Sequence, residues 1–259
     1  MIRRHEPDAI WLIHQGTHAH LAGQIAARWA ENGSPITPRE ELILAAIVHD
    51  TGWNAADQAP RLNDKGLPRS FMEMDLQEHM QIWQRSIWGA FAQNRYAGLL
   101  TSLHCSALYD MRLNEWNDSP EDREMIAAFL EAQRQWEHGV IADLRDHPRY
   151  GDAVAEERLA ENLRLLQVWD YLSLLVCMGP DHEETIPNVP VEGGQRTTLR
   201  VKPAGTHTIR VEPFPLDTSL MVWIDARRLH GAPFDSDEAL RRALDDAAYE
   251  PLRLVITGS

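Results

Sequence analysis

Helical periodicity dominates the chain up to residue 179. Apolar residues recur at helical spacing over four long segments, residues 75–93, 96–114, 120–146 and 152–178. Two shorter helices are predicted upstream. One runs from Thr17 to about Glu31, and the other begins at Thr37-Pro38-Arg39-Glu40, a sequence typical of a capping box. The pattern therefore predicts a set of amphipathic helices packed around one core.

The pattern changes after Gly179. Residues 180–196 contain several Pro and Gly residues and are predicted to be a linker. Beyond it, strands are predicted near 197–202, 206–212, 219–229 and 252–257, with a short helix over 237–249. Residues 8–14 predict an N-terminal strand, which needs a partner sheet. We expect a mainly α fold with a helical domain over 1–179 and a small β-rich extension over 197–259, packed on the helices.

A polar segment interrupts the helical part. Residues 51–70 are rich in Gly, Pro, Asn and Asp, and they predict a loop without regular structure. Connections of this length often border an active site. The candidates for substrate binding in this loop are Trp53, Asp57, Lys65 and Arg69. The two cationic side chains would suit a phosphate or a carboxylate, although a solvated loop explains each residue equally well.

The composition narrows the classes of partner. Lys and Arg total 25 against 39 Asp and Glu, so the formal net charge is −14. This charge argues against nucleic acid or a membrane surface as the partner. Cys105 and Cys177 cannot form a disulfide framework, and the first residues lack the apolar core of a signal peptide. We therefore expect a cytoplasmic protein that acts on a small molecule, anionic substrates included, and leave a homo-oligomer open.

The dipeptide His49-Asp50 is the first candidate for chemistry. It ends an apolar helix, where a charged pair is costly to bury without compensation. Imidazole and carboxylate together suit Fe, Mn, Co, Zn or Mg better than copper. On the dipeptide alone, a metal site and a helix-ending Asp beside a hydrogen-bonded His explain the sequence equally well.

Three further residues favour the metal. His18 begins a helix, His104 lies in the apolar run 99–105, and Asp170 lies in the apolar run 165–175. A carboxylate in such a run seldom lacks a partner. Helical bundles build metal sites from side chains that several helices direct inward. Each residue alone is more simply explained by a core hydrogen bond, but together they predict a shared cation.

The order of these residues, H…HD…D, resembles that of the HD-domain superfamily. Three segments are more closely similar to an uncharacterised bacterial family of HD-like proteins, residues 15–23, 46–53 and 169–174. The resemblance implies an HD-type helical fold and a first metal held by four residues, His18, His49, Asp50 and Asp170. Superfamily members with two metals add two histidines between HD and the last Asp, an interval that here holds His79 and His104.

Two ligand positions stay open. His20 competes with His18, and residues two apart cannot share a helix face. The resemblance favours His18. Glu78 competes with its neighbour His79, which is also the candidate most easily explained as an ordinary helix residue.

These residues favour a metal-dependent hydrolase that acts on a phosphate ester, with one or two divalent ions and a preference for iron or manganese. Asp50 is the expected acceptor of a proton from water, or a bridge between two metals, and His104 is the second catalytic candidate. A di-iron oxygenase is the alternative, because proteins resembling inositol oxygenase use the same ligand order. The third hypothesis is a non-catalytic metal-binding or sensing module, with the β-rich extension as its partner surface.

Overall fold

The computed structural model describes residues 1–30, 36–191 and 195–258. The strands are β1 (Ile2–His5), β2 (Ile10–Ile13), β3 (Glu184–Pro190), β4 (Arg196–Pro203), β5 (Thr208–Glu212), β6 (Leu220–Leu229) and β7 (Tyr249–Thr257). The α-helices are α1 (Gln15–Arg28), α2 (Arg39–Val48), α3 (Asn54–Gln58), α4 (Leu76–Gln93), α5 (Arg95–Glu115), α6 (Pro120–Leu144), α7 (Glu156–Met178) and α8 (Asp237–Asp246). Two 3₁₀ turns, η1 (Thr51–Trp53) and η2 (Phe71–Glu73), lie between α2 and α4. In the described ranges, we find no helix with the length and apolar character needed to cross a membrane.

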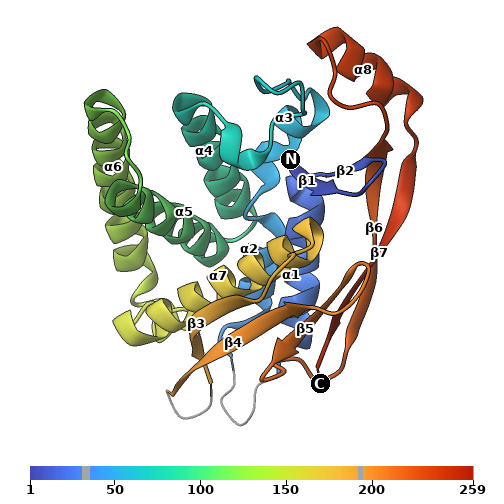
Figure 1. The fold of residues 1–259 in the computed structure, drawn as a ribbon. Helices are drawn as coiled ribbons and strands as arrows, with labels where there is room; N and C mark the ends of the chain where they lie inside the picture. The colour runs from blue at the N-terminus through green and yellow to red at the C-terminus, as the bar shows by residue number, and fades with distance from the viewer. Residues whose placement is uncertain (31–35, 192–194, 259) are drawn as a thin grey trace.

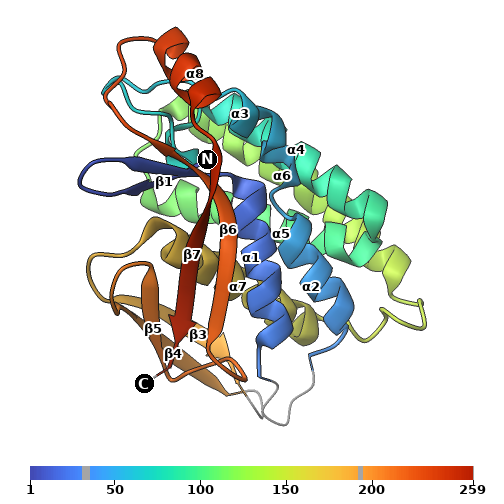
Figure 2. The same ribbon diagram turned by 90° about the vertical axis from the view of Figure 1, so that its right-hand side faces the viewer.

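One seven-stranded sheet unites the two ends of the chain. Its order is β1-β2-β6-β7-β5-β4-β3, and the β5–β7 pair is parallel while the other neighbours are antiparallel. Strand β2 pairs with β6 through Ile10 and Leu229, so the N-terminal hairpin extends the C-terminal sheet. Figures 1 and 2 show the sheet wrapped along the side of the molecule that holds α1 and α7, while α4, α5 and α6 lie on the other side.

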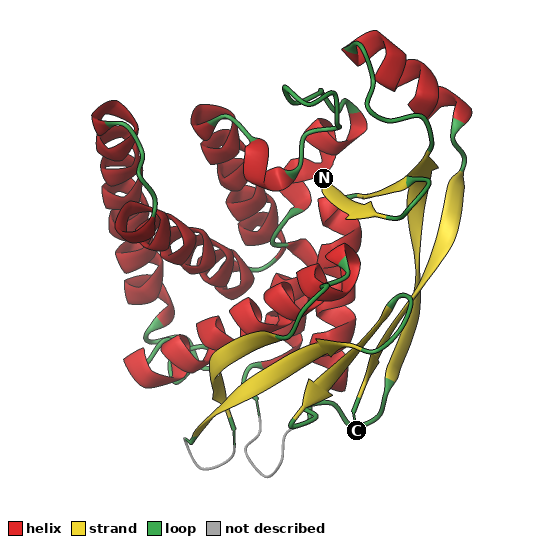
Figure 3. Cartoon of the chain, in the orientation of Figure 1, coloured by secondary structure: helices red, strands yellow, loops and turns green. Residues whose placement is uncertain are grey.

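The expected fold class, a mainly α bundle with a small β-rich extension, is wrong. Helices account for 53% of the described residues and strands for 20%, which makes the fold α+β with the sheet as a full layer (Figure 3). Helix α7 contacts β1, β3 and β7, and α1 contacts β6. Sequence periodicity is a local signal, and it did not show that strands from both ends of the chain join one sheet.

Three local predictions also need correction. The 51–70 segment contains η1 and α3 rather than continuous loop. The expected linker contains β3, although its residues 192–194 lie outside the described ranges. Helix α1 ends at Arg28, and its predicted end at Glu31 also lies outside them.

The predicted capping box at the start of α2 is wrong as well. Pro38 is the N-cap residue, and no side chain caps the helix. The carbonyl of Thr37 instead accepts a hydrogen bond of 3.0 Å from the Asn162 side-chain amide. A tertiary contact with α7 therefore holds the residue before α2, and no side chain caps the helix.

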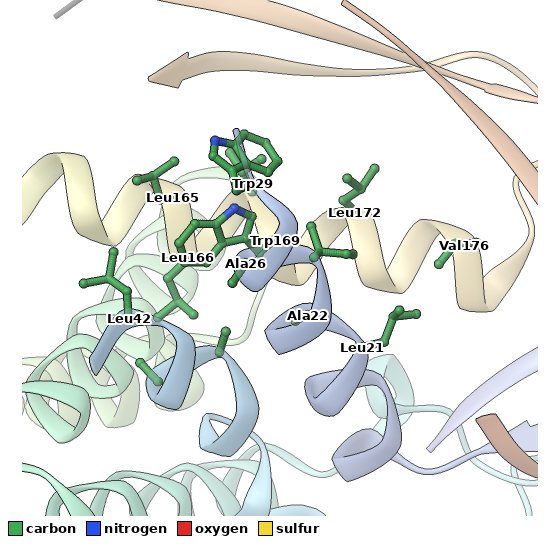
Figure 4. Packing of buried hydrophobic residues seen from close by; sticks show 14 of the residues in the cluster. Leu21, Ala22, Ala26, Trp29, Leu42, Leu165, Leu166, Trp169, Leu172 and Val176 are labelled. Carbon is green, nitrogen blue, oxygen red and sulfur yellow. The ribbon is translucent and has the colours of Figure 1, made fainter. Parts of the chain in front are cut away.

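The main core lies where α1, α2 and α7 meet. Figure 4 shows Trp29 at the end of α1 beside Trp169 of α7, with Ala22 and Ala26 facing the same space. The ring centroids of the two tryptophans are 6.0 Å apart, and Trp169 is fully buried. The inner face of the sheet belongs to the same apolar cluster, since Leu254 of β7 is part of it. Sheet and helices therefore share one core.

Leu254→Ala tests this shared core. Leu254 is fully buried, so its truncation removes packing and leaves a cavity, and we expect a loss of about 2–5 kcal/mol in the free energy of unfolding. Met221→Ala is the matched control, because Met221 is 55% exposed on the neighbouring strand and should change stability by no more than about 0.5 kcal/mol. Urea denaturation followed by circular dichroism measures both. Equal losses of stability in the two variants would contradict a core shared by the sheet and the helices.

Candidate metal centre

Five buried side chains from four separate helical regions converge on one point. His18 lies in the first turns of α1, His49 caps the C-terminus of α2, and Asp50 follows it. His104 comes from the middle of α5 and Asp170 from α7. All five are at most 9% exposed. Their ligand atoms form two groups, His18–His49–Asp50 and His49–His104–Asp170, and within each group the atoms lie within 4.8 Å of one another.

Ser173 determines which nitrogen of His18 carries the hydrogen. The Ser173 hydroxyl donates to the backbone carbonyl of Asp170 at 2.7 Å, because a carbonyl oxygen can only accept. Its oxygen therefore accepts from His18 Nδ1, which lies 2.8 Å away. His18 Nδ1 thus carries the hydrogen, and Nε2 points at Asp50 Oδ2 at 2.8 Å.

His49 is held in the same way by the backbone of its own helix. Its Nδ1 donates to the carbonyl oxygen of Ala46 at 2.9 Å. The remaining nitrogen, Nε2, faces Asp170 Oδ1 at 3.2 Å and Asp50 Oδ2 at 3.7 Å. The last turn of α2 therefore orients the ring toward the two carboxylates.

Unless the rings are doubly protonated, the Nε2 atoms of His18 and His49 each carry a lone pair. Each of these lone pairs faces a carboxylate oxygen. Two electron-rich atoms at such short range, buried away from water, need a positive charge between them. Histidines that bind metals commonly have this arrangement, with the other ring nitrogen donating to a carbonyl or a hydroxyl. The donor set therefore fits a cation, and the buried His and Asp side chains could hold a metal ion.

The protonation equilibria agree with this need for positive charge. Burial alone would lower the pKa of His49, but the carboxylates of Asp50 and Asp170 outweigh it and raise the pKa to about 9. Burial would raise the pKa of Asp170, yet hydrogen bonds to His104 and His49 hold it well below its usual value. The pKa of Asp50 is lowered in the same sense, by His49 and His18 against the effect of burial. Without a metal, a proton on His49 supplies the missing charge.

His104 completes the group from the side of α5. Its Nε2 lies 3.4 Å from Asp170 Oδ2, and its ring meets that of His49 edge to face with centroids 5.7 Å apart. In contrast to His18 and His49, its Nδ1 has no hydrogen-bond partner among the described residues. His104 is therefore the least constrained of the three imidazoles.

A close contact between η1 and α4 places Asp50. The Gly52 amide donates to the Ser86 hydroxyl at 3.0 Å. A Cβ atom at residue 52 would lie 2.1 Å from the Ile82 carbonyl oxygen, so the backbone approach requires glycine. The glycine after the HD pair is thus a packing requirement that brings Asp50 to the end of α2.

A cavity of about 220 Å³ opens onto the cluster. His49, Asp50, His104 and Asp170 line it together with Arg112. The other lining residues are mostly apolar or aromatic: Gln15, Trp53, Phe71, Met72, Met74, His79, Trp83, Leu108, Tyr109, Met111, Trp116 and Leu174. Small-molecule sites typically have this form, an apolar hollow with a few convergent polar groups.

The structure separates the competing ligand positions. His20 is exposed, whereas His18 is fully buried in the cluster. Glu78 lines a neighbouring cavity instead. His79 lines the main cavity but lies outside both ligand groups, because Nδ1 is bonded to the Tyr109 hydroxyl and Nε2 accepts from the Trp83 indole.

The four predicted substrate-binding residues are separated in the same way. Trp53 is buried and lines the main cavity. Asp57 accepts a hydrogen bond from the Gln15 amide and lies 2.8 Å from the amino group of Met1, so it ties β1 and α1 to α3. Arg69 lines the neighbouring cavity and donates to the Leu62 carbonyl. Lys65 is exposed and does not line the main cavity.

Two residues that were not predicted, Ser173 and Arg112, also contribute to the site, and helical spacing indicates both. Ser173 follows Asp170 by three positions, which places both on one face of α7. Arg112 follows His104 by eight positions, two turns along the same face of α5. Arg112 is held by both carboxylate oxygens of Asp118, at 2.8 and 2.7 Å, and this pairing raises its pKa.

Metal binding should stabilise the protein through His49 and Asp170. At a free Zn²⁺, Mn²⁺ or Co²⁺ concentration near 100 times Kd, we expect a gain of about 2.7 kcal/mol and a rise in Tm of roughly 5–10 °C. His49→Ala and Asp170→Asn should each abolish most of that rise. His20→Ala, an exposed histidine on the same helix as His18, should keep it. Differential scanning fluorimetry compares each variant with and without metal, and an unchanged rise in Asp170→Asn would refute the site.

Metal affinity should increase with pH up to about 9. The metal needs the neutral imidazole, whereas the metal-free site keeps His49 protonated below a pKa of about 9. Each unit of pH below that value therefore lowers the apparent affinity, by up to about tenfold through this one group. Competition with a chelator between pH 6 and 9, corrected for the protonation of the chelator itself, measures the slope. A flat profile would show that no proton leaves the site.

Comparison with known proteins places the chain in a family without assigning its chemistry. A family model described as "Protein of unknown function (DUF3891)" matches residues 1–231, which include every proposed ligand. No curated protein and no solved structure matches the chain. The expected membership of the HD-domain superfamily, or of an HD-like bacterial family, is wrong, because no HD-domain family matches. The order H…HD…D consists of only four residues, and such a short pattern arises too easily by chance. The chain belongs to the DUF3891 family.

Proposed function

We propose that this protein is a metal-dependent hydrolase that acts on phosphate esters. The observation that carries the proposal is the pair of imidazole nitrogens, on His18 and His49, that are held facing buried carboxylates. His49 and both carboxylates line the cavity. A buried pair of this kind is costly as mere structure, and a cation between the groups offsets the cost. Strongly perturbed carboxyl and imidazole groups in a cavity are also typical of reactive sites.

The proposal includes one cation. The two ligand groups share His49, which offers a single ligand atom because its Nδ1 is bonded to Ala46. One imidazole nitrogen binds one cation, so the two groups describe one site. A second metal would need His79, whose two nitrogens are already bonded to Tyr109 and Trp83.

The donor set suits an oxygen-preferring or borderline divalent ion. Three imidazoles and two carboxylates favour iron, manganese, cobalt or zinc over copper, and two carboxylates favour the harder ions of this group. We therefore propose iron or manganese as the resident metal. Elemental analysis of protein purified without chelators identifies it.

The chain's own residues divide the remaining work. A divalent cation at this point would lower the pKa of water and neutralise charge on phosphoryl oxygens. Asp50 lines the cavity and accepts the proton that water loses. His104, also in the lining, belongs to the donor set through Nε2, so it would hold the cation rather than contact the substrate. Arg112 stays cationic beside Asp118 and faces the anionic end of an ester.

Asp50→Asn tests the proposal. Loss of the proton acceptor should lower kcat for 4-nitrophenyl phosphate by about 10²–10⁴-fold in Mn²⁺-loaded protein, with little change in folding. His20→Ala should retain the wild-type rate. The assays are carried out without oxygen, because an activity that requires O₂ would indicate oxidation rather than hydrolysis.

The assay results distinguish a wrong substrate class from a wrong reaction type. Hydrolysis of 4-nitrophenyl acetate but not of the phosphate would replace the substrate class and keep the hydrolase. A metal-loaded protein that hydrolyses neither ester, or an Asp50→Asn variant at the wild-type rate, would contradict the hydrolase itself.

A further inference from the structure

A chain of three hydrogen-bonded side chains lies beside the metal centre without joining it. The Trp83 indole nitrogen donates to His79 Nε2 at 3.2 Å, and His79 Nδ1 lies 2.9 Å from the Tyr109 hydroxyl. All three line the same cavity as His49, Asp50, His104 and Asp170. The Trp83 ring also contacts the ring of His104, with centroids 5.6 Å apart, so the chain borders the cluster directly.

The direction of these hydrogen bonds follows from their first donor. An indole N–H can only donate, so His79 Nε2 must accept and carries no hydrogen. Burial lowers the pKa of His79 to about 4, which keeps the ring neutral with a single hydrogen. That hydrogen is on Nδ1, and the Tyr109 oxygen accepts it. Packing of His79 between Trp53 and Trp83 holds the ring in place, with centroids 5.6 and 6.2 Å away.

The Tyr109 hydroxyl hydrogen is therefore directed elsewhere. The part of the chain that the structure describes offers it no second acceptor, and Tyr109 lines the cavity. Burial raises the pKa of Tyr109 above its ordinary value, so the group remains a donor. A neutral phenol whose oxygen is already an acceptor presents its O–H to whatever lies in the cavity.

The rest of the cavity favours a ligand with an apolar body. Phe71, Met74, Leu108 and Leu174 belong to its lining. Three lining residues are also among the large apolar side chains that remain exposed: Met72 at 62%, Met111 at 45% and Trp116 at 43%. Exposed apolar groups gathered around a hollow typically mark a binding site. A cavity of about 150 Å³ holds benzene, so about 220 Å³ suits a body of roughly two fused rings.

We propose that Tyr109 donates a hydrogen bond to an oxygen of a ligand whose apolar, ring-sized body lies among the aromatic and methionine side chains of the cavity. If the proposed function holds, this ligand is the substrate, and Tyr109 binds an oxygen of the ester. His79 and Trp83 are positioning residues that orient the phenol. The recognised class is then a phosphate ester with an aryl or similarly bulky apolar group, rather than a small polar phosphate ester.

A pair of ligands that differ in one acceptor tests the proposal without catalysis. 2-Acetylnaphthalene carries a carbonyl oxygen, and 2-ethylnaphthalene has the same shape without it. A neutral hydrogen bond contributes about 0.5–1.5 kcal/mol, so the ketone should bind the wild-type protein roughly 2- to 12-fold more tightly. Quenching of tryptophan fluorescence measures both dissociation constants.

The Tyr109→Phe variant should abolish that preference while still binding the ethyl compound. Tyr249→Phe, which removes a hydroxyl on β7 away from the lining residues, should leave the preference unchanged. The inference would be overturned if Tyr109→Phe preferred the ketone as strongly as the wild-type protein does. Failure of both compounds to bind the wild-type protein would also overturn it. Binding with the expected preference but without any ester hydrolysis would instead reject the proposed function and keep this inference.

The wild-type protein supplies a second test that needs no variant of Tyr109. Long-range ¹⁵N–¹H correlation spectra distinguish the two neutral histidine tautomers, and Trp83→Phe assigns which signal depends on the indole donor. We expect His79 to carry its hydrogen on Nδ1 at neutral pH. A single hydrogen on Nε2 would make Nδ1 an acceptor, reverse the hydrogen bond to Tyr109 and refute the proposal.

Discussion

The positive charge that must lie between His18, His49 and the two carboxylates is the constraint on which the rest of this structure depends. Hydrogen bonds to Ser173 and Ala46 hold each Nδ1 as a donor, so the opposite nitrogens face Asp50 and Asp170 with lone pairs. Burial removes the water that would otherwise screen this arrangement. A proton balances the site at the cost of a strongly raised imidazole pKa, and a metal ion balances it with the coordination that these ring orientations favour.

The fold meets this constraint by anchoring each ligand beside a core residue. On α7, Trp169 is buried against Trp29 while the next residue, Asp170, points to the cluster. Successive residues on a helix point about 100° apart, so one helix can supply the core and the site together. On the other side of the site, Gly52 lets η1 approach α4 closely enough to place Asp50. The sheet behind α1 and α7 belongs to the same apolar cluster as these helices.

Two histidines near the centre, His49 fully buried and His79 partly buried, show how the surroundings of an imidazole decide its role. His49 faces two carboxylates, and its pKa is raised to about 9. His79 faces an indole and a phenol, and burial lowers its pKa to about 4. The first therefore accepts a cation, whereas the second relays the direction of a hydrogen bond to Tyr109. A polar reacting centre and an apolar binding region thus meet in one cavity.

The sequence alone was sufficient for the long helices and for identifying His49, Asp50 and Asp170 as polar groups in apolar segments that need partners, because apolar periodicity and a charged group in an apolar run are local signals. Tertiary structure decided the rest. It paired β2 with β6 across the length of the chain, which made the fold α+β. It buried His18 and exposed His20, and it bonded His79 to Tyr109 instead of the cluster. Strand pairing and side-chain direction depend on what packs against a residue from elsewhere in the chain, and spacing along the sequence does not contain that information.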